Sequence, residues 1–317
     1  MDRVHRFRLT HAEGTPAAYD GFLAMKAGEG LVEVTGGRVW YEVVGSGDAT
    51  PLLVLHGGPG FTHEYMRSLE ALADERPVVF YDQLGCGRSD RPDDLSFWTT
   101  ERHVEELALV RWALGLEKVH ILGQSWGGML VTDYALTRPT GVESIVMASP
   151  CISIPRWVAD AARLKAALFP ELIATIDSHE ARGFTTCPEY MAAMLVYYKR
   201  HVCRLDPWPV EVERAFHTYG PVVYETMWGP SEFTVSGNLS DYDRSGRLKE
   251  IELPVLFTCG RHDEATPESV GWYSSLLPGS RLVVFEESSH MSHLEERERY
   301  NDVIREFLRE VEGERAR

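Results

Sequence analysis

Three polar residues of this chain have the side chains that nucleophilic catalysis requires. Ser125, Asp263 and His290 each come shortly after an apolar run of the kind that forms a buried strand. A serine hydroxyl is a poor nucleophile until an imidazole accepts its proton, and the imidazole needs a carboxylate to fix its tautomer. We therefore predict that Ser125 is a nucleophile, that His290 is its base, and that Asp263 orients the base.

The surroundings of Ser125 favour this role. It lies in the pentapeptide Gly-Gln-Ser-Trp-Gly, between an apolar run at 119–122 and a helix-like segment at 128–134. A sharp strand-to-helix turn of the form G-x-S-x-G exposes the serine oxygen, and its glycines let strand and helix pass closely. The pentapeptide alone also fits a glycine-rich turn with a capping serine, and the flanking strand and helix favour the nucleophile.

Two other histidines compete with His290 for the role of base. His293 follows three residues later, and His262 directly precedes Asp263. His290 is nearer to the end of its strand, from which a short loop can reach the serine. We therefore prefer His290 and interpret His262 as a neighbour of the triad.

An oxyanion hole is predicted upstream of the serine. The run H-G-G-P-G at 56–60 follows a continuous apolar segment at 51–55, and the carboxyl end of a buried strand is where α/β sheets bind ligands. Gly58 can offer a backbone N–H that no side chain blocks. The second N–H is expected from Trp126, the residue after the nucleophile. A plain strand-to-helix loop is the alternative, but it does not need so many glycines.

The elements that must position these residues follow an α/β pattern. Strand-like and helix-like segments alternate, which predicts a mostly parallel central sheet flanked by helices. The chain order Ser, Asp, His is that of the α/β-hydrolase fold. Between 150 and 244 the strand pattern gives way to helical runs broken by prolines. We predict that this segment is a helical cap inserted into a core of residues 1–149 and 245–317, with 1–28 as a peripheral arm.

Composition restricts the function further. The 317 residues carry a net charge of −16, which argues against nucleic acid or an anionic membrane as the main partner. No apolar run is long enough to span a membrane or to serve as a signal peptide. Five cysteines, odd in number and without a C-x-x-C motif, indicate reduced thiols in a cytoplasmic protein. Neither a metal nor an organic cofactor is expected.

Four motifs resemble those of the proline iminopeptidases, the α/β-hydrolase peptidases of the prolyl aminopeptidase family. They are H-G-G-P-G at 56–60, D-Q-L-G-C-G-R-S at 82–89, G-Q-S-W-G-G at 123–128 and G-R-H-D-E at 260–264. The resemblance covers roughly residues 30–310. In the expected cap, W-G-P-S-E-F-T at 228–234 resembles the tricorn-interacting aminopeptidase branch. That branch is less strict about proline and frees several N-terminal residues from short peptides.

The resemblance also implies which residues bind the substrate's free α-amine. By position they are Glu232, in the expected cap, and Glu264, beside Asp263. Two carboxylates in a cleft of low dielectric would favour an ammonium group strongly. The alternatives are that Glu232 is a solvated cap residue and that Glu264 points to solvent.

Together these observations predict a serine aminopeptidase. It would release an N-terminal residue, proline or another that is often apolar, from a short peptide through an acyl-enzyme. An L-amino-acid amidase, or an amide or ester hydrolase acting on a specialised metabolite, shares the motifs and is the alternative. The intact triad argues against a ligand-binding protein on an inactive hydrolase scaffold. Haloalkane and epoxide hydrolases of this fold need an aspartate where Ser125 stands.

Overall fold

The computed structural model describes residues 26–315. The predicted peripheral arm at 1–28 therefore falls almost wholly outside the described residues, and Gly28 already begins the first strand. No helix in the described part of the chain is both long enough and apolar enough to cross a membrane.

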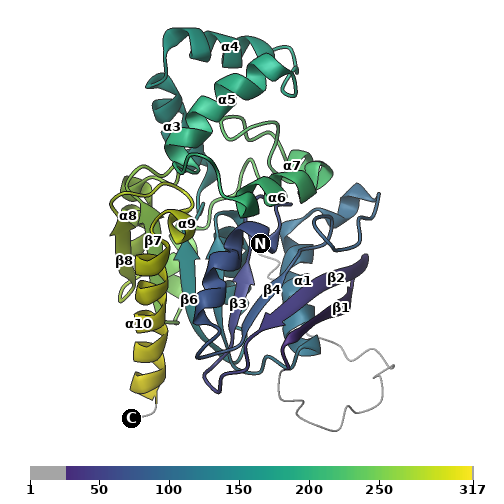
Figure 1. Cartoon of the computed structure of the whole chain (residues 1–317), viewed down its shortest axis with the longest axis vertical. Coiled ribbons are helices and arrows are strands. Elements are labelled where there is room, and N and C mark those ends of the chain that lie inside the picture. The colour runs from purple at the N-terminus through teal and green to yellow at the C-terminus, as the bar shows by residue number, and fades with distance from the viewer. Residues whose placement is uncertain (1–25, 316–317) are drawn as a thin grey trace, which may run out of the picture.

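A sheet of eight strands runs through the molecule in the order β1-β2-β4-β3-β5-β6-β7-β8 (Figure 1). Only β2 pairs antiparallel with its neighbours, and the strands from β4 to β8 are all parallel to one another, as predicted. The strands are β1 (Gly28–Val34), β2 (Gly37–Val44), β3 (Leu52–Leu55), β4 (Val78–Tyr81), β5 (Val119–Gln124), β6 (Val142–Ala148), β7 (Val255–Gly260) and β8 (Arg281–Phe285).

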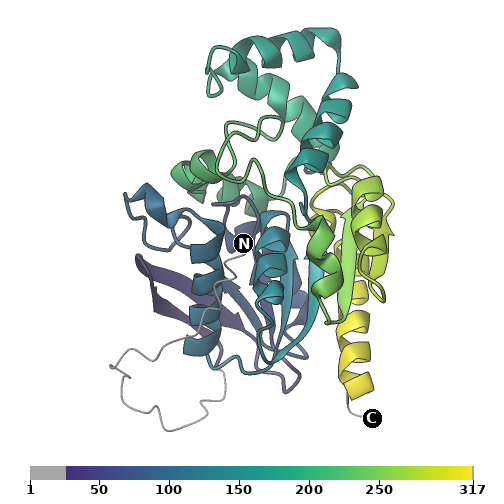
Figure 2. The same cartoon turned by 180° about the vertical axis from the view of Figure 1, so that it is seen from behind.

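Each face of the sheet has its own hydrophobic core, because successive side chains of a strand point to opposite faces. In β3, Leu53 and Leu55 join one core, whereas Leu52 and Val54 join the other. The first core is covered by α1 (Thr100–Ala113), α2 (Trp126–Leu136) and α8 (Pro267–Ser275), and the second by the 3-10 helix η1 (His63–Leu72) and by α10 (Arg297–Arg315) (Figures 1 and 2). Shorter helical turns are η2 (Leu95–Phe97), η3 (Ser245–Glu250) and α9 (Ser292–Glu295).

Between β6 and β7 the chain leaves the sheet and forms five helices. They are α3 (Ile154–Ala166), α4 (Pro170–Glu180), α5 (Pro188–His201), α6 (Val210–Thr218) and α7 (Pro221–Met227). Proline occupies the first turn of α3, α4, α5 and α7, where its missing N–H costs no helical hydrogen bond. Helices α3, α4 and α5 form the upper lobe in Figure 1. The division into a core and a cap with bounds at 150 and 244 stays a prediction.

Candidate active site

Ser125 occupies the sharp turn between β5 and α2. Its φ of 54° lies in the left-handed region, which few residues with a side chain adopt. Strand and helix approach so closely that a Cβ at Gly123 would lie 2.2 Å from the carbonyl oxygen of Gly127. The turn therefore has the conformation of a nucleophile elbow. Among the described residues the Oγ of Ser125 has no hydrogen-bonding partner, and the side chain lines a cavity.

Asp263 and His290 come together from the loops that follow β7 and β8. The Nδ1 of His290 lies 2.7 Å from Oδ1 of Asp263, and both side chains are buried. Asp263 is itself held by Ser149, whose Oγ donates to Oδ2 at 2.6 Å, and by the N–H of Ala265 at 2.8 Å. Because the carboxylate accepts the proton on Nδ1, the lone pair of the histidine is on Nε2. His290 and Ser125 line the same cavity.

The two competing histidines lie elsewhere. The Nε2 of His293 donates to the carbonyl oxygen of Tyr65 at 3.0 Å, and burial lowers the pKa of His293 to about 3. Neither His293 nor His262 is among the residues that line the cavity. The geometry therefore favours His290 as the base.

The two predicted oxyanion donors follow neighbouring strands. Gly58 follows β3 and Trp126 follows β5, and these strands pair in parallel up to Leu55 and Gly123. The φ of Gly58 is 113°, a value that a side chain would strain. Neither the N–H of Gly58 nor that of Trp126 has an acceptor within residues 26–315. Both N–H groups are thus available to a negatively charged oxygen.

Sequence reasoning missed a chain of hydrogen bonds between buried groups. It joins the loop after β3, the turn after β5 and the loop after β8. The hydroxyl of Tyr65 accepts from the N–H of Gly57 at 2.7 Å and donates to Oε1 of Gln124 at 2.6 Å. Gln124 in turn donates from Nε2 to the carbonyl oxygen of His290 at 3.3 Å. Burial raises the pKa of the Tyr65 hydroxyl, which keeps it protonated. Tyr65 lies in no motif, so nothing in the sequence marked it.

Gln83 makes a second link between the predicted oxyanion donors. Its Nε2 donates to the carbonyl oxygen of His56 at 3.1 Å, and its Oε1 accepts from Nε1 of Trp126 at 2.9 Å. Its backbone N–H donates to Nε2 of His56 at 3.0 Å. Burial lowers the pKa of His56 to about 4, so the ring is neutral at pH 7 and can accept this bond.

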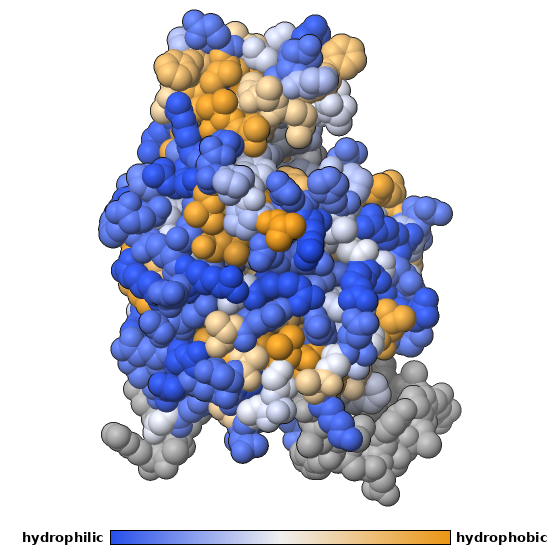
Figure 3. All heavy atoms as spheres, viewed as in Figure 1, coloured by the Kyte–Doolittle hydropathy of each residue, from blue (hydrophilic) through white to orange (hydrophobic). Residues whose placement is uncertain are grey.

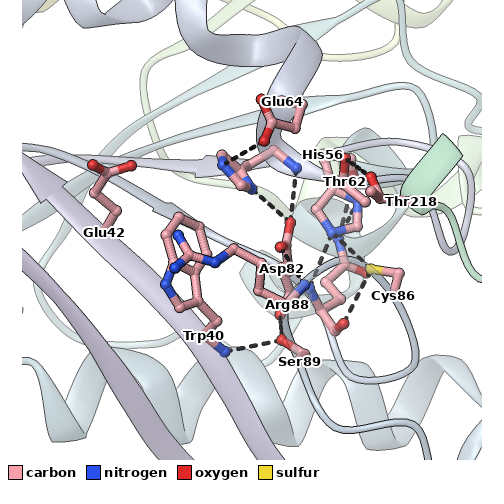
Figure 4. A network of polar contacts seen from close by, with 12 residues as sticks. Trp40, Glu42, His56, Thr62, Glu64, Asp82, Cys86, Arg88, Ser89 and Thr218 are labelled. Carbon is pink, nitrogen blue, oxygen red and sulfur yellow. Dashed lines mark hydrogen bonds and ion pairs between the residues drawn. The ribbon is translucent and has the colours of Figure 1, made fainter. Parts of the chain in front are cut away.

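Asp82, the first residue after β4, connects its own loop to His63 at the start of η1 (Figure 4). Its Oδ1 accepts from the backbone N–H and from Nδ1 of His63, at 2.9 and 2.8 Å, and its Oδ2 accepts from the N–H of Arg88 at 2.9 Å. The D-Q-x-G-x-G-R-S motif, noticed in the sequence only as a family signature, therefore braces the loop that carries Gly58.

Glu232 and Glu264 line the cavity together with Ser125 and His290. Oε1 of Glu264 lies 3.9 Å from Nε2 of His290, and the other oxygen of Glu264 is buried without a hydrogen-bonding partner. The hydroxyl of Tyr224 donates to Oε1 of Glu232 at 2.6 Å. Burial and the charge of Glu232 raise the pKa of Glu264 well above its usual range, and burial also raises the pKa of Glu232. The pair therefore holds a proton more readily than exposed glutamates do and gains from a nearby cation.

The inserted helices contact both loops of the triad. The carbonyl oxygen of His201, at the end of α5, accepts from the N–H of Glu264 at 3.3 Å and from that of His290 at 3.2 Å. A second contact holds the loop that carries Glu232. The carboxylate of Glu180, at the end of α4, accepts from the hydroxyls of Ser231 at 2.6 Å and Thr234 at 3.1 Å.

The cavity at these residues has a volume of about 350 Å³. Its wall is mostly aromatic and aliphatic, and it combines residues that follow the sheet with residues of the inserted helices. Within the described residues, His179, Cys187 and Glu189 place three metal-ligand atoms within 4.8 Å of one another, but none of the three lines this cavity.

Comparisons with known proteins show which proteins the chain is similar to. A family model described as the alpha/beta hydrolase fold matches residues 50–297. The proline iminopeptidase of Heyndrickxia coagulans is 49% identical over 285 residues, which cover 89% of this chain and 99% of that protein. The crystal structure of the Mycobacterium smegmatis proline iminopeptidase superposes with a TM-score of 0.83 at 39% identity, covering 90% of this chain and 98% of that one. That of VinJ superposes with a TM-score of 0.87 at 40% identity, covering 90% and 99%.

Proposed function

Since the chain belongs to the proline iminopeptidase family of α/β-hydrolases, we propose that it is a serine aminopeptidase. It releases the N-terminal residue of a short peptide or amide, with proline as the first candidate. The observation that carries the proposal is the placement of Glu232 and Glu264 in one cavity with Ser125 and His290. An aminopeptidase needs both an acyl-transfer centre and a site for a free ammonium group, and this cavity offers side chains for both.

The reaction proceeds in two halves. His290 takes the proton of Ser125 while Oγ attacks the carbonyl carbon after the first residue, and the N–H groups of Gly58 and Trp126 stabilise the oxyanion. Protonated His290 then gives its proton to the leaving amine, which departs and leaves an acyl-enzyme. Water attacks the acyl-enzyme with His290 again as base, and Asp263 keeps the imidazole oriented throughout.

The two glutamates position the substrate for this attack. The ammonium group of the first residue lies between the carboxylates of Glu232 and Glu264 and donates charge-assisted hydrogen bonds to them. The cation also lowers the raised pKa values of the pair, which favours release of any proton bound to either carboxylate when the substrate binds. Binding is therefore selective for a free amine.

The test compares aminoacyl amides with and without N-acetylation. We expect the wild type to cleave the free amine and to reject the acetylated form, because acetylation removes the cation from a buried acidic pair. Glu232→Gln and Glu264→Gln should each lower kcat/KM on the free amine by about tenfold or more. A simple acyl ester without an amine should be affected much less.

Ser125→Ala is the inactive control. It should lose about 10³-fold or more in kcat on every substrate, because the nucleophile itself is gone. Equal activity of the wild type on free and acetylated amides would refute the aminopeptidase and leave an amide or ester hydrolase.

A further inference from the structure

The charged side chains of the cavity are almost all acidic. Three carboxylates line it, those of Glu225, Glu232 and Glu264. Within residues 26–315 no lysine or arginine lines it, and His290 is the one basic side chain. A ligand that fills the cavity therefore meets negative charge beyond the two glutamates that bind its amine.

Glu225 occupies a different part of the wall from the amine-binding pair. It lies on α7 with an exposed side chain, so it belongs to the open side of the cavity. Glu225 and Tyr219 both line the cavity, and the charge of Glu225 adds to the effect of burial in raising the pKa of Tyr219. Glu232 and Glu264 are instead associated with His290, at the catalytic end.

The wall on the side of Tyr219 is apolar. The ring of Phe61 packs against those of Phe216 and Tyr219, with centroids 5.0 and 5.8 Å apart. On α5, Met191 lines the cavity and is also 50% exposed. Met191 thus adds apolar surface at the upper lobe, where Figure 3 shows orange patches among hydrophilic residues.

Arg91 contacts the chain beside this wall, but its guanidinium already has hydrogen-bonding partners. Arg91 donates from its guanidinium to the carbonyl oxygens of Thr218 and Tyr219, at 2.6 and 3.3 Å. It does not line the cavity. A carboxylate bound beside Phe61 would therefore have no cation as a partner among the described lining residues and would share the cavity with Glu225.

We infer that the natural leaving group is an apolar amine without a carboxylate, so that the preferred substrates are aminoacyl amides rather than free dipeptides. This inference rests on the proposed function and concerns the other half of the same cavity. In a dipeptide the carboxylate is attached to the carbon that bears the leaving nitrogen, so it stays close to the scissile bond and within the cavity while the amine occupies the glutamate pair. There it meets the like charge of Glu225, and no lysine or arginine among the described lining residues offsets the repulsion. An amide or an apolar group at that position has no such charge.

The experiment compares prolyl-phenylalanine with its C-terminal amide, and the alanyl pair as a second set. Both members of a pair share the first residue, the scissile bond and the leaving side chain, and differ only in the terminal charge. We expect kcat/KM to be about tenfold or more higher for the amide, which corresponds to about 1.4 kcal/mol. The ratio of kcat/KM for the amide to kcat/KM for the dipeptide should fall when ionic strength is raised, because salt screens the repulsion.

Charge variants test whether Glu225 causes the preference for the amide. Glu225→Lys should lower the amide-to-acid ratio about fivefold or more by improving the dipeptide, and Glu225→Gln should lower it by less, because it removes a charge without supplying a cation. Glu213→Lys is the matched control. Glu213 is exposed on the neighbouring helix α6 and does not line the cavity, so this variant changes the net charge equally but should leave the ratio at the wild-type value.

The outcomes separate this inference from the proposed function. Wild-type cleavage of dipeptide and amide at equal rates overturns the inference and leaves the aminopeptidase intact. The same holds if Glu225→Lys and Glu213→Lys change the ratio alike, because net charge would then explain it. Failure to cleave either member of a pair, or equal cleavage after N-acetylation, counts against the aminopeptidase itself.

Discussion

His290 and His293 lie in one short stretch of chain, yet their ring nitrogens have opposite environments. His290 donates from Nδ1 to the buried carboxylate of Asp263, whereas His293 donates to the backbone carbonyl of Tyr65. A ring whose donor is committed to a carbonyl cannot also be steered by Asp263. The difference between a base and a structural histidine is therefore set by the partner of each ring.

Matched substitutions test this assignment. His290→Gln should lower kcat by about 10³-fold, because an amide cannot take the proton of the nucleophile. His293→Gln keeps an N–H donor for the carbonyl of Tyr65, and kcat should stay within about an order of magnitude of the wild type. Steady-state kinetics on one good amide substrate measure both. A loss confined to His293→Gln would move the base to His293.

The role that we propose for Glu264 in binding the amine conflicts with the stability of the fold. The pKa of Glu264 is raised in the folded protein by burial and by the charge of Glu232, so the folded state keeps a proton that the unfolded chain releases. Ionisation of Glu264 therefore lowers the free energy of unfolding. This destabilisation is absent below the ordinary pKa of the carboxyl group and grows as pH rises above it. Glu264→Gln should therefore raise Tm at pH 7, by about 2 °C, and leave it unchanged near pH 4.

Thermal unfolding of the two proteins at both pH values measures the effect. Glu213→Gln serves as the control, since this carboxylate is exposed on α6, and the substitution should leave Tm unaltered. A shift of the same size at pH 4 and pH 7 would show that ionisation of Glu264 is not its cause.

At the scale of elements, the inserted helices do more than cover the sheet. The end of α5 accepts hydrogen bonds from the loops that carry Glu264 and His290, and the end of α4 holds the loop that carries Glu232. Both sides of the proposed amine site thus depend on the ends of these two helices. Glu180 is in this sense a positioning residue.

Removing the carboxylate of Glu180 should loosen the loop without touching the triad. We expect Glu180→Ala to raise KM for aminoacyl amides by about fivefold, with a smaller change in kcat, because Glu232 loses its support rather than its charge. An acyl ester without an amine should show no change in KM. Glu171→Ala, at the exposed start of the same helix, is the control. An equal rise in KM for the ester would indicate general damage to the lobe.

At the scale of the whole molecule, Glu312 connects the last helix, α10, to the amino ends of β3, β4 and β5. Its Oε1 lies 2.8 Å from the guanidinium of Arg76 and 3.3 Å from Nε2 of His120, and it accepts from the N–H of Thr50 at 3.2 Å. Burial opposes ionisation of Glu312, but the hydrogen bonds from His120 and Arg76 outweigh it and lower the pKa to about 2. The carboxylate thus links segments that are distant in the sequence.

A depressed carboxyl pKa contributes stability above the ordinary value, and that stability is lost as pH falls toward about 2. Glu312→Gln should therefore lower the free energy of unfolding at pH 7 by about 1 kcal/mol, and the difference should shrink between about pH 4.5 and pH 2. Urea unfolding across this pH range measures it. Glu310, on the same helix as Glu312, makes an exposed ion pair with Arg281 of β8, and Glu310→Gln should have little effect. A pH-independent difference would exclude this role for Glu312.

The sequence by itself determined the fold and placed the candidate chemistry on it. Apolar runs that end in glycines or polar residues predict strands whose carboxyl ends meet at one edge, and the sheet confirms them. The triad and oxyanion residues could be proposed because each lies within a few residues of such an end. Short-range rules suffice there, since chain direction and strand order fix where those ends lie.

Only the tertiary structure decided which side chains support that chemistry. Tyr65, Gln124 and His290 form one hydrogen-bonded chain although 59 and 166 residues separate its links. Glu180 reaches Ser231 across 51 residues, and no motif marks Glu180. Such contacts depend on how whole elements pack, so a local sequence pattern does not predict them. Burial likewise decides the protonation of Glu264, because its pKa depends on neighbours that folding brings together.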